Sequence, residues 1–583
     1  MIINEFKRIV IAIICGMTTF YSSAQQRTQS QAADIAIKAL SKEMATSREA
    51  LHKAVSHSCR LTPVNSSIIE RSISLKEAGM SKQEMPSFAI ADKQPFYIFN
   101  DESSHAFVIV AGDERMGDVL GYSMSSSFTT NQMPDGMAGL LCFYAQTYAD
   151  ICRKTTMVHA PQKAIAWKAI PQMIHSTWGQ GKPYNADCPI HNGQRSLVGC
   201  AATAMAQVMR YHQWPSQGKG SYSYTTGTAH LEQSLEFGSI TFNWNNMSDN
   251  YNSNQNAPDV AKLSHACGVS IAMNYTYNNS WAYCLDIPYA LVQYFSYSSD
   301  VVCYRKEFFS VDKWASIIQR ELQEGRPIIL RGANAKDDNG HFFIIDGCDE
   351  DGNLHVNWGW YGNSDGFFKI DGIGLDAMSD DYSYGQWAIL KISPTDLEEP
   401  EDVFFADSFS AHHIGNYTST QITSVYNHAN TACLKDENTR FNGYIGVALY
   451  DASGKFLKMA GSSSQVSLRS NWGYSSLYIN FDDKSLNLSD GQYTLRPVVV
   501  NSERNDNLVT PIRTLGGETD SLFLVIADGQ VNVMAELPTD IASTYATLTR
   551  TQTRTYSLDG RRIKTSKNRR GFYIVDGKKR LSH

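Results

Sequence analysis

The sequence predicts an α+β protein built from several folding units. Three observations lead to this prediction. Residues 170–396 begin with helical periodicity and end with short apolar strands separated by Gly, Asn and Asp turns. Residues 25–152 mix helical and strand patterns, and residues 403–537 show only the alternation typical of strands. A helical half followed by an antiparallel sheet indicates two lobes with a cleft between them, where ligands often bind.

Length, composition and charge limit the class of protein. The 583 residues are enough for roughly three or four domains. Hydrophobic residues make up 42% of the chain and aromatic residues 11%, which is sufficient for packed cores. The formal net charge is −7, and no long basic run occurs before the last 35 residues. We therefore expect no nucleic-acid partner.

Residues 1–24 have the pattern of a secretory signal peptide. Lys7 and Arg8 precede an apolar core over residues 9–20, and small residues at 22–24 form a cleavage site. This core is too short to span a membrane, and no other stretch approaches 18 apolar residues. A lipoprotein interpretation through Cys15 is weaker, because bulky isoleucines precede it. We expect a protein that is secreted or held at the cell surface.

The eleven cysteines are too sparse for a disulfide framework in a chain of this length. No CxxC and no Cys/His spacing typical of a metal site occurs, so we expect neither a metal nor another cofactor. The sequence leaves the pairing of these cysteines open. A free reactive thiol in an exported protein is nevertheless notable.

The segment 25–152 is expected to form a small α+β unit. Its predicted elements are a helix over 25–60 with Ala33, Ile35, Ala36 and Leu40 on its apolar face, strands in PFYIFN, HAFVIVAGD and VLGYS, and a helix over 139–152. Residues 153–169 are basic and irregular, which is typical of an exposed connector that proteases can cleave.

The next unit, 170–396, contains the elements that carry chemistry. Helices are predicted over 201–212, 260–267, 288–295 and 311–324, and strands in PIILRG, HFFIIDGCD, NLHVNWGW, GFFKIDG and QWAILKI. An acidic linker then leads to a β-sandwich of the immunoglobulin type over 403–537. The basic tail 549–583 contains two short strand signals, YSLDG and GFYIVDG.

Cys200 is the first candidate for a catalytic residue. It follows Gly199 and begins a helical run without a breaker until Pro215. Unsatisfied N–H groups at a helix start favour the thiolate, which is the nucleophilic form of cysteine. A small buried cysteine that only packs the helix start is the alternative.

His341 is the best candidate for the base that such a nucleophile needs. It follows Gly340 at the start of a predicted strand, and it lies 141 residues after Cys200. Across a cleft, its imidazole can accept the thiol proton and later deliver it to the leaving amine. A histidine with a purely structural role is the alternative.

Three further residue types complete a plausible site. Asn357 could accept a hydrogen bond from the imidazole, and Trp358 or Trp360 could shield that bond from water. Gln180 lies 20 residues before Cys200, and its amide could join the backbone N–H of Cys200 in an oxyanion hole.

These motifs resemble the streptopain family of papain-like cysteine peptidases, which includes interpain-type secreted zymogens of the Bacteroidetes. The similar stretches are GQGKPYN, VGCAATAMAQVMRYHQWP, CGVSIAMNY, GHFFIIDG and HVNWGWYGNSDGFF, in the order of the family and over about residues 170–395. FYIFN and HAFVIVAGDERMGDVLGYS resemble the family's inhibitory propeptide. The tail resembles short C-terminal segments of secreted Bacteroidetes proteins, so a sorting signal is one hypothesis and a small hairpin the other.

The resemblance implies a two-lobed papain-like fold and a secreted cysteine endopeptidase. It implies that Cys200 is the nucleophile, His341 the general base, Gln180 the oxyanion donor, and Asn357 with Trp358 the support of the imidazole. It also implies that Gly340 binds the substrate backbone and that 25–152 is a propeptide, removed by cleavage within the activation linker 153–169. Where the family has a loop rich in Gly and Ser, this chain has Trp281 and Tyr283, and we expect them to shape a substrate subsite.

Other functions fit the sequence less well. Residues 362–366 match G-x-S-x-G, but they link two predicted strands, whereas a nucleophile elbow links a strand to a helix. The H-E-x-x-H motif of metallopeptidases is absent. The main alternative is a catalytically silent scaffold in which the β-sandwich has an adhesion or binding function. Protein and peptide substrates, together with the chain's own propeptide, are the expected partners of the enzyme.

Overall fold

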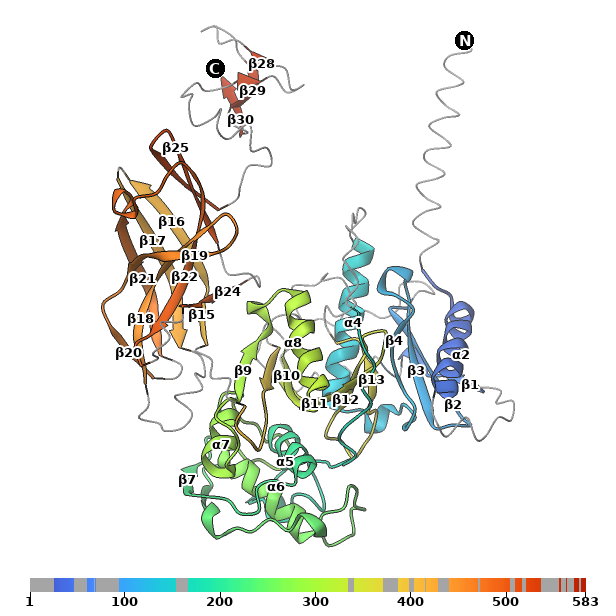
Figure 1. The fold of residues 1–583 in the computed structure, drawn as a ribbon. Coiled ribbons are helices and arrows are strands. Elements are labelled where there is room, and N and C mark those ends of the chain that lie inside the picture. Colours follow the sequence, from blue (N-terminus) through green and yellow to red (C-terminus); the bar gives the residue numbers. More distant parts are fainter. Residues whose placement is uncertain are drawn as a thin grey trace, which may run out of the picture.

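The computed structural model describes most of the chain (Figure 1). The described residues are 26–46, 60–67, 69, 94–153, 166–333, 340–370, 386–397, 403–414, 416–427, 440–469, 472–503, 509–515 and 521–535, with the backbone of four short strands between 555 and 582. The predicted signal peptide and most of the predicted activation linker lie outside these residues.

The central element is a ten-stranded sheet in which each neighbouring pair of strands is antiparallel. Its strands, in order across the sheet, are β1 (Leu61–Pro63), β2 (Phe96–Asp101), β3 (Ala106–Ala111), β4 (Val119–Ser123), β13 (Gly366–Phe368), β12 (Leu354–Asn357), β11 (Gly340–Cys348), β10 (Ile328–Ala333), β14 (Trp387–Leu390) and β9 (Val302–Arg305). The N-terminal unit therefore shares one sheet with the unit that follows it.

The pairing of β4 with β13 joins these two units. Tyr122 lies opposite Phe367, and Gly121 lies opposite Phe368. A Cβ atom on Gly121 would lie 2.2 Å from the ring of Phe368, so only glycine lets the two strands approach this closely. The N-terminal unit thus adds strands to an edge of the sheet, which otherwise would expose unpaired backbone groups.

Both faces of the middle of the sheet are buried. Ile328 and Leu330 on β10 face one hydrophobic core, and Ile329 between them faces the other. Phe342 and Phe343 on β11 divide between the two cores in the same way. This explains why these strands are continuous apolar runs rather than alternating patterns.

Helices cover the two faces of the sheet, as Figure 1 shows. The α-helices are α2 (Gln29–Thr46), α4 (Asp135–Arg153), α5 (Cys200–His212), α6 (Pro258–Ser270), α7 (Asp286–Phe295) and α8 (Val311–Gln323). Helices α4 and α8 pack in one core, whereas α5, α6 and α7 pack in the other. The predicted α+β class and its two-part catalytic unit are confirmed.

Short elements complete this part of the chain. The two small hairpins, which the sequence patterns did not predict, are β5 (Ile190–His191) with β6 (Gln194–Arg195), and β7 (Ser221–Thr225) with β8 (Glu232–Glu236). The 3₁₀ helices of the described chain are η2 (Glu114–Met116), η3 (Thr130–Gln132), η4 (Phe237–Ser239), η5 (Trp244–Asn246), η6 (Lys306–Phe308) and η7 (Asp483–Leu486).

The two N-terminal helices differ from their predicted bounds. The predicted helix over 25–60 corresponds to α2, which buries Ala32, Ala36 and Leu40 against β2–β4; residues 47–59 lie outside the described residues. Helix α4 begins at Asp135, earlier than the predicted start at residue 139. The N–H of Ala138 already donates to the carbonyl of Pro134, and the two glycines of this turn weakened the helical pattern in the sequence.

The C-terminal unit contains two sheets that share a hydrophobic core, as the sequence predicts for a β-sandwich. One sheet consists of β15 (Phe404–Ala406), β16 (Ser408–Ile414), β17 (Tyr417–Asn427), β21 (Gly473–Asp482) and β24 (Arg513–Thr514). The other consists of β18 (Phe441–Asp451), β19 (Phe456–Ser462), β20 (Val466–Leu468), β22 (Gly491–Asn501), β23 (Val509–Pro511), β25 (Leu522–Ala527) and β26 (Gln530–Met534).

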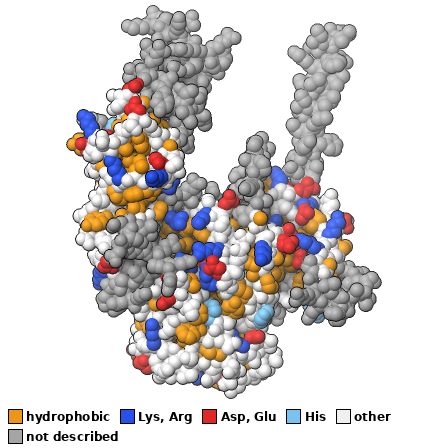
Figure 2. Space-filling model, in the orientation of Figure 1, with side chains coloured by type: hydrophobic (Ala, Val, Ile, Leu, Met, Phe, Trp, Pro, Cys, Tyr) orange, Lys and Arg blue, Asp and Glu red, His pale blue; other side chains and the backbone are white. Residues whose placement is uncertain are grey.

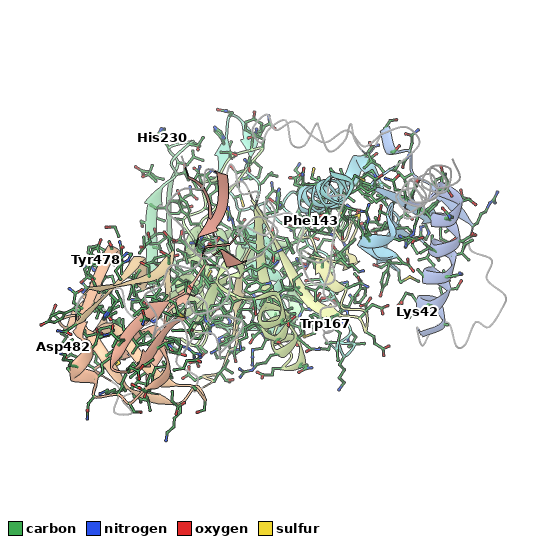
Figure 3. All side chains as sticks on the ribbon, turned by 90° about the horizontal axis from the view of Figure 1, so that it is seen from above. Lys42, Phe143, Trp167, His230, Tyr478 and Asp482 are labelled. Atoms are coloured by element: carbon green, nitrogen blue, oxygen red, sulfur yellow. The ribbon has the colours of Figure 1, made fainter. Side chains whose placement is uncertain are left out.

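The sandwich packs against the unit before it. Phe405 stacks on Phe308 with ring centroids 4.2 Å apart, and Nη1 of Arg305 donates a 2.9 Å hydrogen bond to the hydroxyl of Tyr426. Seen from above, Tyr478 on the sandwich and Lys42 on α2 lie at opposite ends of the molecule (Figure 3). In the tail, β27 (Thr555–Tyr556), β28 (Arg562–Ile563), β29 (Gly571–Val575) and β30 (Lys578–Ser582) form a four-stranded sheet.

The described part of the chain carries charges of both signs on its surface. Among the described residues, none of the helices has the length and apolar character needed to cross a membrane. Figure 2 shows acidic and basic side chains interspersed over the visible face.

Candidate active site

Cys200 is the first residue of α5, as predicted. Gly199 caps the helix with a φ of 90°, a conformation that favours glycine. A Cβ atom on Gly199 would also lie 2.6 Å from the end of the Met273 side chain. The glycine therefore sets the sharp entry into the helix that presents Cys200 at its N-terminus, where it is partly exposed.

The surroundings of Cys200 favour its thiolate. Burial acts to raise the pKa of this thiol, but the hydrogen bond with His341 and the charge of that imidazole lower the pKa, and so do the N–H groups of Phe342 and Ala201. The net result is a pKa below the usual value of a cysteine. A lowered pKa is the property expected of a nucleophilic cysteine.

His341 lies near the start of β11, opposite Gly332 of β10. The structure thus brings the two predicted catalytic side chains together, one from a helix start and one from the sheet. Another neighbour of His341 comes from the N-terminal unit: Nε2 of His341 lies 3.7 Å from Oδ2 of Asp135, the first residue of α4. Asp135 was not predictable as a site residue, because nothing near it in the chain indicates a contact with a residue of the next unit.

Gly136 places the start of α4 directly on the candidate site. A Cβ atom on Gly136 would lie 2.8 Å from the ring of Trp358 and 3.6 Å from Cβ of His341. The backbone of the N-terminal unit therefore contacts both the predicted base and the predicted supporting tryptophan.

Trp358, the predicted support of the imidazole, lies like His341 near the start of α4. Its indole Nε1 donates a 2.9 Å hydrogen bond to the carbonyl of Ser364, and its backbone N–H donates a 2.8 Å bond to Oδ1 of Asp365. The side chain is buried and packs against Phe343. The neighbouring Trp360 is only partly buried, at the edge of one core.

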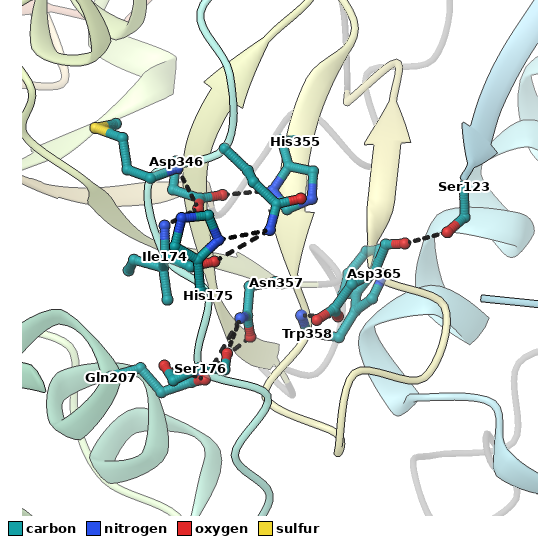
Figure 4. A network of polar contacts seen from close by, with 12 residues as sticks. Ser123, Ile174, His175, Ser176, Gln207, Asp346, His355, Asn357, Trp358 and Asp365 are labelled. Atoms are coloured by element: carbon teal, nitrogen blue, oxygen red, sulfur yellow. Dashed lines mark hydrogen bonds and ion pairs between the residues drawn. The ribbon is translucent and has the colours of Figure 1, made fainter. Parts of the chain in front are cut away.

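Asn357 has partners that differ from the predicted one (Figure 4). Its Oδ1 accepts hydrogen bonds from Nε2 of Gln207 at 2.9 Å and from the N–H of Gly359 at 3.0 Å. Its Nδ2 donates a 2.8 Å bond to the carbonyl of Ser176. The expectation that the Asn357 amide accepts from the His341 ring is thus not met in this structure, because both ends of that amide are engaged: with Gln207 of α5, with Gly359, and with the irregular segment at Ser176.

Gln180 is buried in the segment that leads to Cys200. Its carbonyl accepts a 2.9 Å hydrogen bond from the N–H of Val198, which ties the two segments together. The next N–H, of Gly181, donates a 2.7 Å bond to the hydroxyl of Tyr361. A Cβ atom on Gly179 or Gly181 would collide with Tyr361, at 2.6 and 2.5 Å. Tyr361 therefore holds the Gln180 segment in place, and the sequence analysis overlooked it.

Two of the three predicted subsite residues, Trp281 and Tyr283, lie on one loop beside the nucleophile. Trp281 and Tyr283 are 43% and 65% exposed, and their rings meet edge to face with centroids 5.3 Å apart. The carbonyl of Ser280, on the same loop, lies 3.3 Å from the position of a Cβ atom on Gly199. Gly340, the remaining predicted subsite residue, begins β11 and is partly exposed.

A buried polar network supports the strand that carries Asn357 (Figure 4). Nδ1 of His355 lies 2.5 Å from Oδ1 of Asp346, and Oδ2 of Asp346 accepts from the N–H of Ile174. Burial acts to lower the pKa of His355, but the charge of Asp346 and this hydrogen bond raise it more. Burial raises the pKa of Asp365 to about 7. In the part of the chain that the structure describes, no group of three or more acidic, His or Cys side chains could hold a metal ion.

Comparisons with known proteins agree with this geometry. Residues 178–368 match the model of the Peptidase C10 family, and residues 24–148 match that of the Spi protease inhibitor. The chain is 32% identical to streptopain of Streptococcus pyogenes over 304 residues, which cover 48% of this chain and 75% of streptopain. It is 31% identical over 330 residues to the thiol protease/hemagglutinin PrtT of Porphyromonas gingivalis, covering 52% of this chain but only 38% of PrtT.

Two solved structures of Prevotella intermedia proteins are also similar. A prointerpain A fragment is 27% identical with a TM-score of 0.46, and the match covers 52% of this chain and 97% of the fragment. Active interpain A is 33% identical with a TM-score of 0.35, covering 40% of this chain and 98% of that one. From the identity to streptopain over three quarters of its length, together with the two family matches, we conclude that this chain belongs to the Peptidase C10 family of cysteine peptidases and carries an inhibitor-like N-terminal unit.

Proposed function

We propose that this chain is the secreted zymogen of a cysteine endopeptidase, with Cys200 as its nucleophile, His341 as its general base and residues 25–152 as its inhibitory propeptide. The observation that carries the proposal is the hydrogen bond between Cys200 and His341 at a helix N-terminus, with Asp135 and Gly136 lying on the same site.

The proposed chemistry follows from these groups. His341 takes the thiol proton, and the thiolate of Cys200 attacks the carbonyl carbon of the scissile peptide bond. The resulting oxyanion accepts hydrogen bonds from the backbone N–H of Cys200 and from the side-chain amide of Gln180. Collapse of this intermediate expels the amine, which takes the proton from the imidazolium, and leaves an acyl-enzyme. Water activated by His341 then hydrolyses the thioester.

Latency is explained by the position of the N-terminal unit. Its strand β4 pairs with β13, and its helix α4 begins against His341 and Trp358. Ser123 also donates a 2.6 Å hydrogen bond to the carbonyl of Asp365, beside the segment that supports Trp358 (Figure 4). A peptide substrate needs the space that α4 occupies, so removal of the propeptide by cleavage within 153–169 activates the enzyme.

The substrates are proteins and peptides, and the enzyme acts outside the cell or at its surface. Gly340 leaves room for a substrate backbone beside the base, and the exposed rings of Trp281 and Tyr283 favour an apolar side chain in the adjoining subsite. The signal-like residues 1–24 support export, and the tail 549–583 is proposed as a sorting signal. The alternative, a silent scaffold whose β-sandwich binds a partner, is not favoured, since the catalytic unit matches a peptidase family and one matching relative is named a thiol protease.

Self-processing tests the proposal. Purified 25–583 under mild reductant is expected to shed a fragment ending within 153–169 and then to digest casein, whereas Cys200→Ala stays full length. Mass spectrometry identifies the cleaved bond. If both proteins remain intact, and protein cleaved by trypsin also fails to digest casein, the peptidase proposal is wrong. The alternative, a binding function of the β-sandwich, would then be tested.

A further inference from the structure

Two buried cysteines that the proposed mechanism does not use lie side by side. The sulfur atoms of Cys284 and Cys303 are 3.8 Å apart. Cys303 lies on β9, at the edge of the central sheet, where it pairs with Ile389 of β14. Cys284 lies just before α7 and directly after Tyr283 of the exposed aromatic loop. The contact therefore connects the loop beside the nucleophile with the rigid sheet.

At 3.8 Å, the two sulfur atoms are in van der Waals contact and are not bonded in this structure. Two non-bonded sulfurs in van der Waals contact are separated by nearly this distance, whereas a disulfide is about 2.0 Å long. A bond between them therefore requires the two side chains to rotate and the loop that carries Cys284 to shift toward the sheet. By contrast, the buried sulfur of Cys267 lies 3.6 Å from the sulfur of Met209, which forms no such bond.

We propose that Cys284 and Cys303 form a disulfide that fixes the loop carrying Trp281 and Tyr283 to the sheet. The inference rests on the proposed export of the chain, because disulfides persist in oxidising compartments. The two thiols are oxidised by an exported thiol–disulfide oxidoreductase in its disulfide form. One thiolate attacks that disulfide, and the second thiolate displaces the carrier, so that two electrons and two protons end on the carrier's thiols.

Cys284 and Cys303 are less exposed to solvent than the catalytic thiol of Cys200. Cys303 is fully buried and Cys284 is 6% exposed, whereas Cys200 is partly open to solvent. Burial also raises the pKa of Cys303, which disfavours its thiolate in the folded chain. The bond is therefore expected to form before the core closes and to survive the mild reductant that keeps Cys200 active. The reductant used in a protease assay would then not release the loop.

Peptide mapping of an inactive full chain tests the pairing directly. Cys200→Ala in the 25–583 chain, exported to the oxidising periplasm of a bacterial host, is unfolded in denaturant with an alkylating agent and no reductant. After digestion, the peptides of Cys284 and Cys303 are expected as one cross-linked species, two hydrogen atoms lighter than their sum. The peptide of Cys267 is expected in its alkylated form. Recovery of Cys284 and Cys303 as separate alkylated peptides, or joined to other cysteines, overturns the proposal.

Thermal unfolding provides the second test, with Cys267→Ala as the matched control. Both Cys284→Ala and Cys267→Ala remove a buried sulfur, but only the first removes the proposed bond. In the oxidised protein, Cys284→Ala is expected to lower Tm by roughly 5–10 °C more than the control does. This difference in Tm between the two variants is expected to vanish when all samples are unfolded, reduced and refolded under reductant. A difference in Tm that is equal in the oxidised and the reduced protein contradicts a disulfide. Both tests use the inactive Cys200→Ala chain, so their results do not depend on the peptidase proposal.

Discussion

Oδ2 of Asp135 lies 3.7 Å from Nε2 of His341, so the first residue of α4 contacts the predicted general base. Both side chains are partly buried, at 33% and 25% exposure. The contact is an ion pair whenever the imidazole carries a proton, and in that state it stabilises the docked N-terminal unit while occupying the group that the reaction needs.

Asp135→Asn is expected to weaken this docking and to speed self-processing of the 25–583 chain by about 2- to 5-fold, because partly exposed ion pairs contribute up to about 1 kcal/mol. The measurement is the rate at which full-length chain disappears on a denaturing gel. Asp34→Asn serves as the control. It removes an exposed carboxylate on α2 of the same unit and is expected to leave the rate of self-processing unchanged. Equal rates for all three proteins would show that the contact has no part in latency.

Gly136→Ala is expected to loosen the same interface for a steric reason. The added Cβ would lie 2.8 Å from the buried ring of Trp358, which has little freedom to move, so processing should begin earlier than in the parent. Gly139→Ala on the same helix is the matched control, because nothing lies within 4 Å of a Cβ atom there. That change should slow processing slightly, if at all, since alanine stabilises the helix by up to about 1 kcal/mol. Faster processing in both variants would refute the steric explanation.

Tyr361→Phe is expected to lower kcat of the activated enzyme about 10-fold and to change KM less than about 2-fold. The hydroxyl that accepts from the N–H of Gly181 is lost, and the Gln180 segment becomes less well ordered for an oxyanion. A peptide aldehyde, whose adduct carries the developing oxyanion, should bind more weakly by the same factor as kcat falls. A change confined to KM would contradict this positioning role.

Tyr211→Phe is the control for Tyr361→Phe. Its hydroxyl also bonds to the backbone, donating to the carbonyl of Gly325 at 3.1 Å, but away from Gln180. Both variants are expected to lose similar stability, whereas only Tyr361→Phe should lose kcat.

Asp365→Asn is expected to change how stability depends on pH. Burial raises the pKa of Asp365 from its ordinary 3.8 to about 7, so between these values the folded chain holds a proton that the unfolded chain has lost. Stability therefore falls as pH rises from about 4 to about 7, by at most about 4 kcal/mol. Asparagine keeps an acceptor for the N–H of Trp358 but does not titrate, so the slope should flatten.

The measurement for Asp365→Asn is Tm against pH in the Cys200→Ala chain. The raised pKa of His355 adds a decline in the same direction above its ordinary value of 6.5. Asp365→Asn retains most of this decline, because Asp346 does more than Asp365 to raise the pKa of His355. Asp187→Asn, at an exposed position, should leave the parent profile unchanged. If Tm of Asp365→Asn changes with pH in parallel with Tm of the Cys200→Ala chain between about pH 4 and pH 6, Asp365 is ionised in the folded chain over that whole range.

Much of the fold was predictable because its signals are local. The helix at Cys200 was recognised from apolar periodicity and a preceding glycine, and the strand at His341 from a short apolar run bounded by turns. The bounds of α4 were less predictable, because Gly136 and Gly139 interrupt the helical pattern. Neither periodicity nor turn chemistry indicated that β4 would pair with β13 and join the two units in one sheet.

The sequence by itself determined the chemistry of the site: a cysteine at a helix start, a histidine at a strand start, a glutamine before them, and an asparagine and a tryptophan after them. These features depend on residue type and on neighbours within one or two turns. Only the tertiary structure decided which side chains meet, such as Asp135 with His341, Tyr361 with Gly181, and Asn357 with Gln207 instead of the imidazole. The physical reason is that these contacts join residues far apart in the chain, whose approach is set by the packing of two cores against one sheet.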